Sequence, residues 1–134
     1  MTRGAGRRAA CDDAFGDARL KQAEAFALSA GLDPLSDDGP TRSVAVSNAV
    51  LAGIAAADSI CCRTIRKRSA SGNHADAVDL LKEAPGQAPD AAAHLMILIG
   101  VKGMAQYEAR NPSVSDTKRA LRAMGALIRI ARAI

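Results

Sequence analysis

Apolar residues recur at helical spacing over most of the chain, and polar or Pro- and Gly-rich breaks divide it into segments. The breaks have the sequences LDPLSDDGPT, SASGN, APGQAP and NPS. No segment shows the period of two that is typical of strands. The pattern therefore predicts five helices, over residues 12–30, 42–67, 74–83 and 90–109, and from residue 113 or 115 to the C-terminus.

Residues at the predicted helix ends have the chemistry that helix ends need. Asp12 places a negative charge at the start of the first helix, and Gly31 is a suitable stop. Thr41 or Ser43 can cap the second helix, and Asn73 can cap the third. These local signals support the same division into five helices.

Composition favours a single small, soluble domain. The 134 residues are 49% hydrophobic, and Ala, Leu, Ile and Val dominate that fraction while aromatic residues are scarce. Small aliphatic side chains suit helices that approach closely, and Ala has the highest helix propensity. We therefore expect an all-α domain over residues 12–134, preceded by a flexible segment at residues 1–11.

Several classes of protein are disfavoured. The chain has no run of 18 or more uninterrupted apolar residues, so we expect no membrane span. Its basic first residues lack the apolar region of a signal peptide, which favours a cytoplasmic location. Because Cys61 and Cys62 are adjacent and Cys11 makes the count odd, we expect small buried hydrophobes and no disulfide. The two histidines and three cysteines lack ligand spacing, so no metal or other cofactor is predicted.

One charged residue falls within the apolar stripe of each of two long helices. Asp58 lies in line with Leu51, Ile54 and other apolar residues of the second helix, and Lys102 lies in line with Leu98 in the fourth. An isolated buried charge is unfavourable, so we predict that Asp58 and Lys102 meet between these helices. Two interpretations stand: an ion pair or snorkelling lysine without chemistry, or a polar site inside the bundle.

The last helix carries a row of cations. Lys118, Arg122, Arg129 and Arg132 fall within about 80° of one another and span about 20 Å. The whole chain has a formal net charge of +4. The row is either a solvated helix face or a surface that follows a nucleic-acid backbone. No aromatic residues interleave with it, so contact with nucleic acid would be to phosphates, without sequence recognition.

Four stretches in a fixed order resemble the HEPN family (higher eukaryotes and prokaryotes nucleotide-binding domains). They are AAADSI at 55–60, GNH at 72–74, KGMAQY at 102–107 and SVSD at 113–116. The resemblance covers about residues 44–131. It implies an up-down antiparallel bundle of four long helices plus one short helix, and a homodimer.

Some HEPN proteins are metal-independent ribonucleases that carry an R-x(4–6)-H motif. The corresponding segment here is Lys102-x4-Tyr107, with Lys for Arg and Tyr for His, and tyrosine is a poor base at neutral pH. Arg68-x5-His74 has the motif's spacing but lies between the second and third helices. The resemblance makes His74, Arg68, Lys102 and Tyr107 the candidate catalytic residues.

The leading functional hypothesis is a catalytically degenerate HEPN-like binding or interaction module associated with RNA or nucleotides. It would be one component of a defence or toxin–antitoxin system, with a partner such as a small nucleotidyltransferase. One alternative is a metal-independent HEPN ribonuclease toxin. The other is a structural protein of an assembly.

Overall fold

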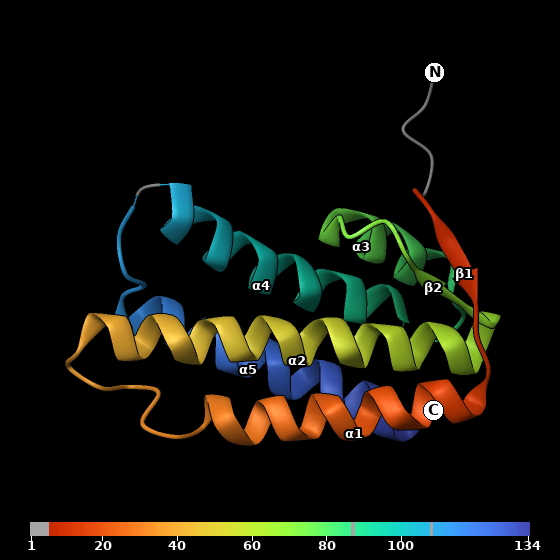
Figure 1. Ribbon diagram of the computed structural model, residues 1–134, viewed down its shortest axis with the longest axis horizontal. Helices are drawn as coiled ribbons and strands as arrows, with labels where there is room; N and C mark the ends of the chain where they lie inside the picture. Colours follow the sequence, from red (N-terminus) through yellow and green to blue (C-terminus); the bar gives the residue numbers. More distant parts are fainter. Residues whose placement is uncertain (1–5, 87, 108) are drawn as a thin grey trace.

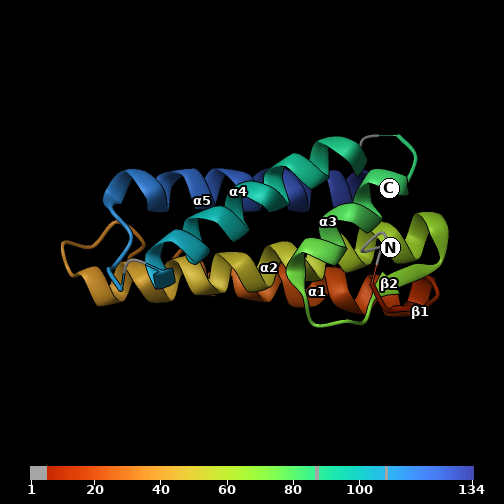
Figure 2. The ribbon, with the colours of Figure 1, turned by 90° about the horizontal axis from the view of Figure 1, so that it is seen from above.

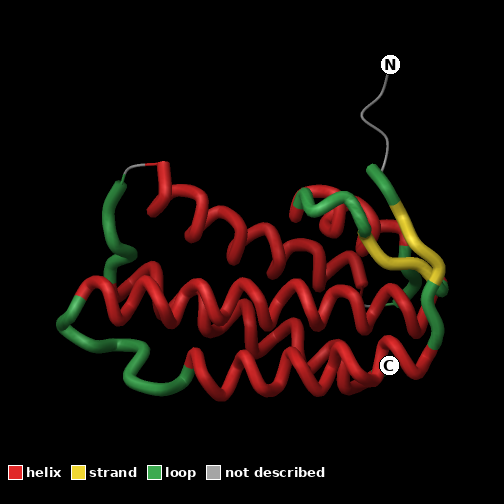
Figure 3. Tube along the Cα trace, viewed as in Figure 1, coloured by secondary structure: helices red, strands yellow, loops and turns green. Residues whose placement is uncertain are grey.

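A computed structural model describes residues 6–86, 88–107 and 109–134 (Figures 1 and 3). The described part is mostly helical, with five helices and one small two-stranded sheet. The helices confirm all five predicted segments, with ends shifted by a few residues. In chain order the elements are β1 Arg8–Ala10, α1 Asp13–Ala30, α2 Gly39–Ile65, β2 Lys67–Ser69, α3 His74–Glu83, α4 Ala88–Tyr107 and α5 Val114–Ala133.

Side-chain caps set where the helices begin. Asn73 caps α3 and Ser113 caps α5, as expected from their positions in the sequence. Helix α2 begins earlier than predicted because the Asp38 carboxylate accepts a hydrogen bond from the backbone N–H of Thr41. Pro40 stands in the first turn, where its missing N–H costs no hydrogen bond. The two capping residues predicted for α2, Thr41 and Ser43, therefore lie inside the helix.

Helix α2 is the centre of the packing. It runs the length of the molecule beside α1, and it also contacts α3, α4 and α5 (Figures 1 and 2). A Cβ added at Gly53 would lie 2.5 Å from Cδ1 of Leu98 and 3.2 Å from Cδ1 of Leu127. The glycine thus lets side chains of α4 and α5 approach the α2 backbone, as the small-residue composition suggests.

The apolar stripe predicted on α2 is not its core face. Leu51 is 41% exposed, and Ile54 and Asp58 are only partly buried. The buried face consists mainly of alanines, together with Val46, Val50 and Ile60. Close helix packing buries the small side chains, so the larger ones of the predicted stripe stay at the edge.

Helix α2 is also long and apolar enough to cross a membrane by length and composition, which the count of uninterrupted apolar residues did not indicate. An 18-residue window of it has a mean hydropathy of 1.6. However, 72% of that window is buried inside the protein. Its apolar character is therefore accounted for by its place in the core.

The N-terminal segment departs from the sequence-based expectation. Strand β1 pairs antiparallel with β2, with Arg8 opposite Ser69, in a segment that was expected to be flexible. Cys11 then forms a disulfide with Cys62, and the two Cα atoms are 5.3 Å apart. The prediction of no disulfide was wrong because it considered the adjacent cysteines, whereas the bonded partners are 51 residues apart. Cys61 is the free, buried thiol.

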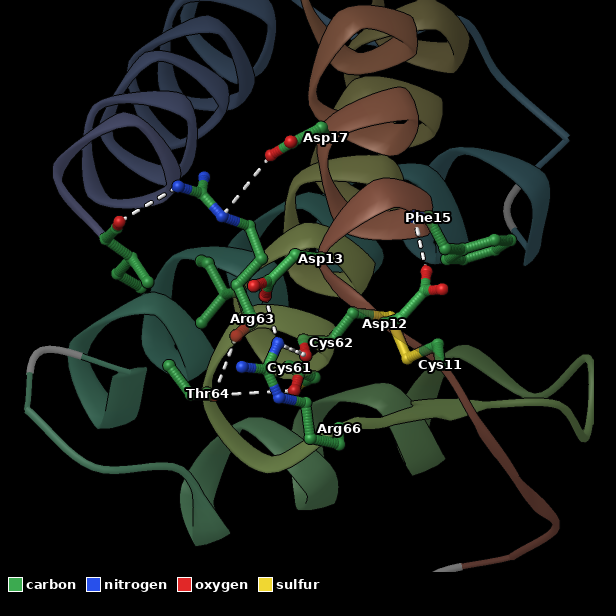
Figure 4. Close-up of polar contacts among 12 residues, drawn as sticks. Cys11, Asp12, Asp13, Phe15, Asp17, Cys61, Cys62, Arg63, Thr64 and Arg66 are labelled. Atoms are coloured by element: carbon green, nitrogen blue, oxygen red, sulfur yellow. Dashed lines mark hydrogen bonds and ion pairs between the residues drawn. A yellow bond between two sulfur atoms is a disulfide. The ribbon is translucent and has the colours of Figure 1, made fainter.

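Ion pairs surround the disulfide, where the start of α1 meets the end of α2 (Figure 4). Arg66 pairs with Asp13, and Arg63 Nε lies 3.5 Å from Asp17 Oδ1. Arg63 also donates to the carbonyl of the last residue through Nη2, at 2.9 Å. We call the disulfide and these two ion pairs the N-terminal clamp, because together they tie α1 to α2.

Candidate functional site

Helix α5 concentrates the charge of the protein. It contains five basic residues and one acidic residue, so its net charge is +4, as large as that of the whole chain. The rest of the chain is therefore balanced in formal charge. Such asymmetry creates a positive potential on one side of a molecule, which attracts anionic partners.

Four of these cations are exposed and have no carboxylate partner among the described residues. Lys118, Arg122 and Arg129 fall within about 40° of one another on the outward side of α5, and Arg119 lies about 60° from Arg122. About two turns of helix separate Arg122 from Arg129. We call them the α5 cation row: Lys118, Arg119, Arg122 and Arg129. Arg132 was predicted to belong to the row, but its Nη2 lies 2.6 Å from Oε2 of Glu24 on α1. That ion pair already satisfies Arg132, so it leaves the row.

Elsewhere the arginines are largely satisfied within the protein. Arg42, for instance, donates to the carbonyls of Ser36 and Pro112. Five more pair with carboxylates: Arg8 with Glu83, Arg19 with Asp58, Arg63 with Asp17, Arg66 with Asp13, and Arg110 with Asp116. Exposed Lys21 on α1 and Lys82 on α3 also lack a carboxylate partner among the described residues, but they stand singly. The α5 cation row differs because four such cations share one helix.

A shallow groove of about 640 Å³ runs beside the row, between α4 and α5. Ile97 from α4 and Ala123 and Ala126 from α5 make part of its lining apolar, and His94 lines it as well. Three members of the α5 cation row, Arg119, Arg122 and Arg129, also line it. Apart from the imidazole of His94, no aromatic side chain is among the described lining residues, so the groove offers cations and apolar groups and no Phe, Tyr or Trp platform for stacking.

Asp58 and Lys102 do not meet. Arg19 Nε on α1 donates to Oδ2 of Asp58 at 2.9 Å, so the carboxylate faces α1. Lys102 instead lines a pocket with Ser43 and Ser47, which lie about three or four turns away from Asp58 along α2. The predicted polar interior site therefore does not exist. The apolar pattern showed that Asp58 needs a partner, but it did not show that α1 supplies that partner.

Partial burial of the Asp58 carboxylate changes its pKa. Loss of solvent raises its pKa, and the charge and hydrogen bond of Arg19 lower it only in part, so the pKa stays above the ordinary 3.8. The charge of Arg68 acts in the same direction as that of Arg19. Asp58 is thus a compensated structural carboxylate between two arginines.

Arg68 and His74, the candidate pair with the ribonuclease spacing, have different neighbours. Arg68 lies on β2 with its guanidinium carbon 5.1 Å from the centre of the Phe15 ring. His74 is the first residue of α3 and is exposed. No hydrogen bond joins the two within the described part of the chain. The side chain of Tyr107, the fourth candidate, lies outside the described residues.

Partial loss of solvent lowers the pKa of His74 although the residue is largely exposed, and the positive charge of Lys102 lowers it further. The imidazole is therefore neutral at neutral pH. Among the described residues no carboxylate orients it, and no group of three or more His, Cys, Asp or Glu side chains is placed to hold a metal ion. A neutral imidazole can accept a proton, but no described side chain orients that of His74 towards a reacting group.

Arg19 and Glu24 on α1 decide how Asp58 and Arg132 are paired, and neither was predicted from the sequence. Nothing in the periodicity of α1 indicated that Arg19 pairs with Asp58, or that Glu24 removes Arg132 from the row. Both contacts join residues far apart in sequence. The only available signal was charge balance, since α1 is rich in both acidic and basic residues.

Comparisons of the chain with models of protein families, with curated proteins and with solved structures give no match.

Proposed function

We propose that this protein is a non-catalytic helical module that binds the phosphate backbone of RNA through the α5 cation row. The observation that carries the proposal is that four exposed cations of one helix lack carboxylate partners within the described residues, while most arginines elsewhere are satisfied. Like charges on one helix repel each other, so the row costs some stability in the free protein. An anionic polymer would remove that cost.

We propose that this binding does not depend on the RNA sequence. The described lining of the groove has no Phe, Tyr or Trp on which bases could stack, and its hydrogen-bonding side chains are His94 and the arginines of the row. Contacts would therefore be to phosphates and would weaken steeply with salt. Ribonuclease activity is not proposed, because Arg68 and His74 have separate neighbours.

The finer architecture, the homodimer and the two-component setting are proposed on the HEPN resemblance. We propose an up-down antiparallel bundle, a homodimer and a cytoplasmic location, with the protein acting as one component of a two-component system. Light scattering coupled to size-exclusion chromatography tests the dimer. In a reducing cytoplasm Cys11 and Cys62 would be thiols. Mass spectrometry of protein alkylated inside cells would therefore detect both as alkylated.

The main test is fluorescence anisotropy of a short labelled single-stranded RNA over a range of salt concentrations. With four phosphate contacts, log Kobs should fall against log salt with a slope of about −3. The variant Arg122→Glu/Arg129→Glu should bind more weakly and lower the magnitude of the slope to about 1.5. The labelled RNA should remain intact during the titration without added metal.

A matched control changes the same charge elsewhere. Lys21 on α1 and Lys82 on α3 are exposed, and neither has a carboxylate partner among the described residues. Lys21→Glu/Lys82→Glu alters the net charge as much as the α5 variant does. If the two variants weaken binding equally, binding follows net charge, and the assignment to the α5 cation row is wrong.

A protein partner with an acidic amphipathic helix is the second candidate, favoured by the apolar part of the groove lining. Ile97, Ala123 and Ala126 would contact its apolar face and the arginines its acidic side. The variant Ile97→Asn separates the candidates. It should weaken binding of such a helix and leave phosphate contacts unchanged.

A further inference from the structure

A second polar site lies away from the α5 cation row. It is a pocket of about 260 Å³ formed by the N-terminal half of α2, the C-terminal half of α4 and the loop that joins α4 to α5. None of the four residues of the row lines it. The pocket therefore needs an explanation of its own, which does not rest on RNA binding.

Two hydroxyl groups enter the pocket from α2. Ser43 and Ser47 are one helical turn apart, so they share a face of the helix. Both residues are partly buried, and neither hydroxyl forms a hydrogen bond with any other described residue. Partly buried hydroxyls that the protein does not satisfy are available to water or to a ligand.

Lys102 supplies the charge. It is partly buried in the pocket wall and has no carboxylate partner within the described part of the chain. Arg110 also lines the pocket, but its Nη1 lies 3.5 Å from Oδ2 of Asp116, which balances its charge. No acidic residue is among the described residues that line the pocket, and Lys102 gives this described lining a positive charge.

The loop wall of the pocket is held in place by the protein. Arg42 donates through Nε to the Pro112 carbonyl at 2.9 Å and through Nη1 to the Ser36 carbonyl at 2.6 Å. Asn111 packs so closely on Gly39 that an added Cβ there would lie 2.5 Å from its Nδ2. A wall fixed before binding reduces the entropy that a ligand must offset.

We propose that this pocket binds one phosphate group, with Lys102 Nζ and the Ser43 and Ser47 hydroxyls as its donors. A phosphate has several strong acceptor oxygens, which suit an ammonium group and two hydroxyl donors. A cation is disfavoured because none of the described lining residues carries a carboxylate. The volume lies just below the usual range for drug-sized ligands, so the phosphate belongs to a small molecule or to the end of a longer chain.

Isothermal titration calorimetry of the full chain with inorganic phosphate tests the site. The wild type should bind at millimolar concentration, and Lys102→Gln should weaken binding by at least about tenfold, because charged hydrogen bonds are lost. Ser43→Ala/Ser47→Ala should weaken it by about tenfold and retain the fold, since Ala favours helix. Lys21→Gln removes the same charge from an exposed site on α1 and should bind like the wild type.

The two sources of the phosphate are separated with short RNAs that carry or lack a 5′-phosphate. A preference for the 5′-phosphate that Lys102→Gln removes assigns the pocket to RNA ends. Without such a preference, binding of inorganic phosphate assigns it to a small molecule. The proposal is overturned if the wild type shows no phosphate binding, or if Lys21→Gln weakens it as much as Lys102→Gln does. Arg122→Glu/Arg129→Glu should leave phosphate binding unchanged, so failure of the RNA proposal would be distinguishable.

Discussion

Arginines of the N-terminal clamp are paired with carboxylates, whereas arginines of the α5 cation row are not paired with any described carboxylate. In the clamp, Arg63 and Arg66 each pair with an aspartate of α1, and a disulfide closes the same junction. On α5, Arg122 and Arg129 are exposed, with no carboxylate partner in the described part. The first arrangement holds two helices together. The second joins no two described elements of the protein through an ion pair.

This difference separates structural from functional charge. A charge that the protein satisfies internally is explained by the fold, because leaving it alone would cost free energy. A cluster of like charges without internal partners has no such explanation, and its repulsion slightly opposes folding. Charge without an internal partner is therefore the better guide to a binding surface than charge alone.

The largest expected effect is loss of the clamp disulfide. The bond closes a loop between residues 51 apart, and a constraint of that length stabilises by about 4 kcal/mol in the chain-entropy model. We expect Cys11→Ala/Cys62→Ala to lower the free energy of unfolding by about 3–4 kcal/mol, measured by urea denaturation.

The reductant dithiothreitol provides the control for this prediction. It should lower the stability of the wild type towards that of the double variant and have no effect on the variant itself. Equal stability of the wild type with and without reductant would show that Cys11 and Cys62 are not bonded in solution.

The next effect concerns Arg19, which lies outside the clamp but joins the same two helices. Asp58 has a side chain only 13% exposed, so Arg19→Gln leaves a mostly buried carboxylate without its donor. We expect a loss of about 2 kcal/mol in the free energy of unfolding. The matched change Arg66→Gln breaks an exposed pair and should cost less than about 1 kcal/mol. Similar losses in both variants would contradict the importance of burial.

The fold was largely predictable from sequence because its signals are local. Asn73 and Ser113 each cap a helix through a backbone N–H only two or three residues further along the chain. The spacing of apolar residues likewise indicates each helix from its own sequence. The strands β1 and β2 were not predicted, because a strand of three residues is too short to show an alternation of polar and apolar positions. Asp38 was missed as a cap because Thr41 and Ser43, close by, have equally suitable side chains.

The candidate sites were only partly predictable because they depend on contacts between distant residues. The exposed cations of α5 followed from the helical period, but the removal of Arg132 by Glu24 did not. In the same way, the apolar pattern selected Asp58 and Lys102 correctly as residues that need an explanation. It could not specify that one would face Arg19 and the other a pocket beside Ser43.

A smaller effect is the pH dependence of two carboxylates with opposite shifts. Burial raises the pKa of Asp58 above 3.8, so as pH rises through 3.8 the unfolded chain loses its proton first. The stability of the wild type relative to Asp58→Asn should therefore fall with rising pH in this window. A hydrogen bond from Arg8 lowers the pKa of Glu83 below 4.5. The stability of the wild type relative to Glu83→Gln should therefore rise as pH approaches 4.5. Urea denaturation across this pH range measures both slopes, and slopes of the same sign would contradict the assignment.

The smallest expected change in stability is the one that tests the comparison most directly. Lys118 and Arg122 are like charges four residues apart, so Arg122→Gln should leave the free energy of unfolding unchanged or raise it by up to about 0.5 kcal/mol. Arg132→Gln, which breaks the pair with Glu24, should lower it by up to about 1 kcal/mol. RNA binding should follow the reverse order, weakened more by Arg122→Gln than by Arg132→Gln. The two arginines of one helix would then have opposite effects on stability and different effects on RNA binding. The presence or absence of an internal partner would account for this difference.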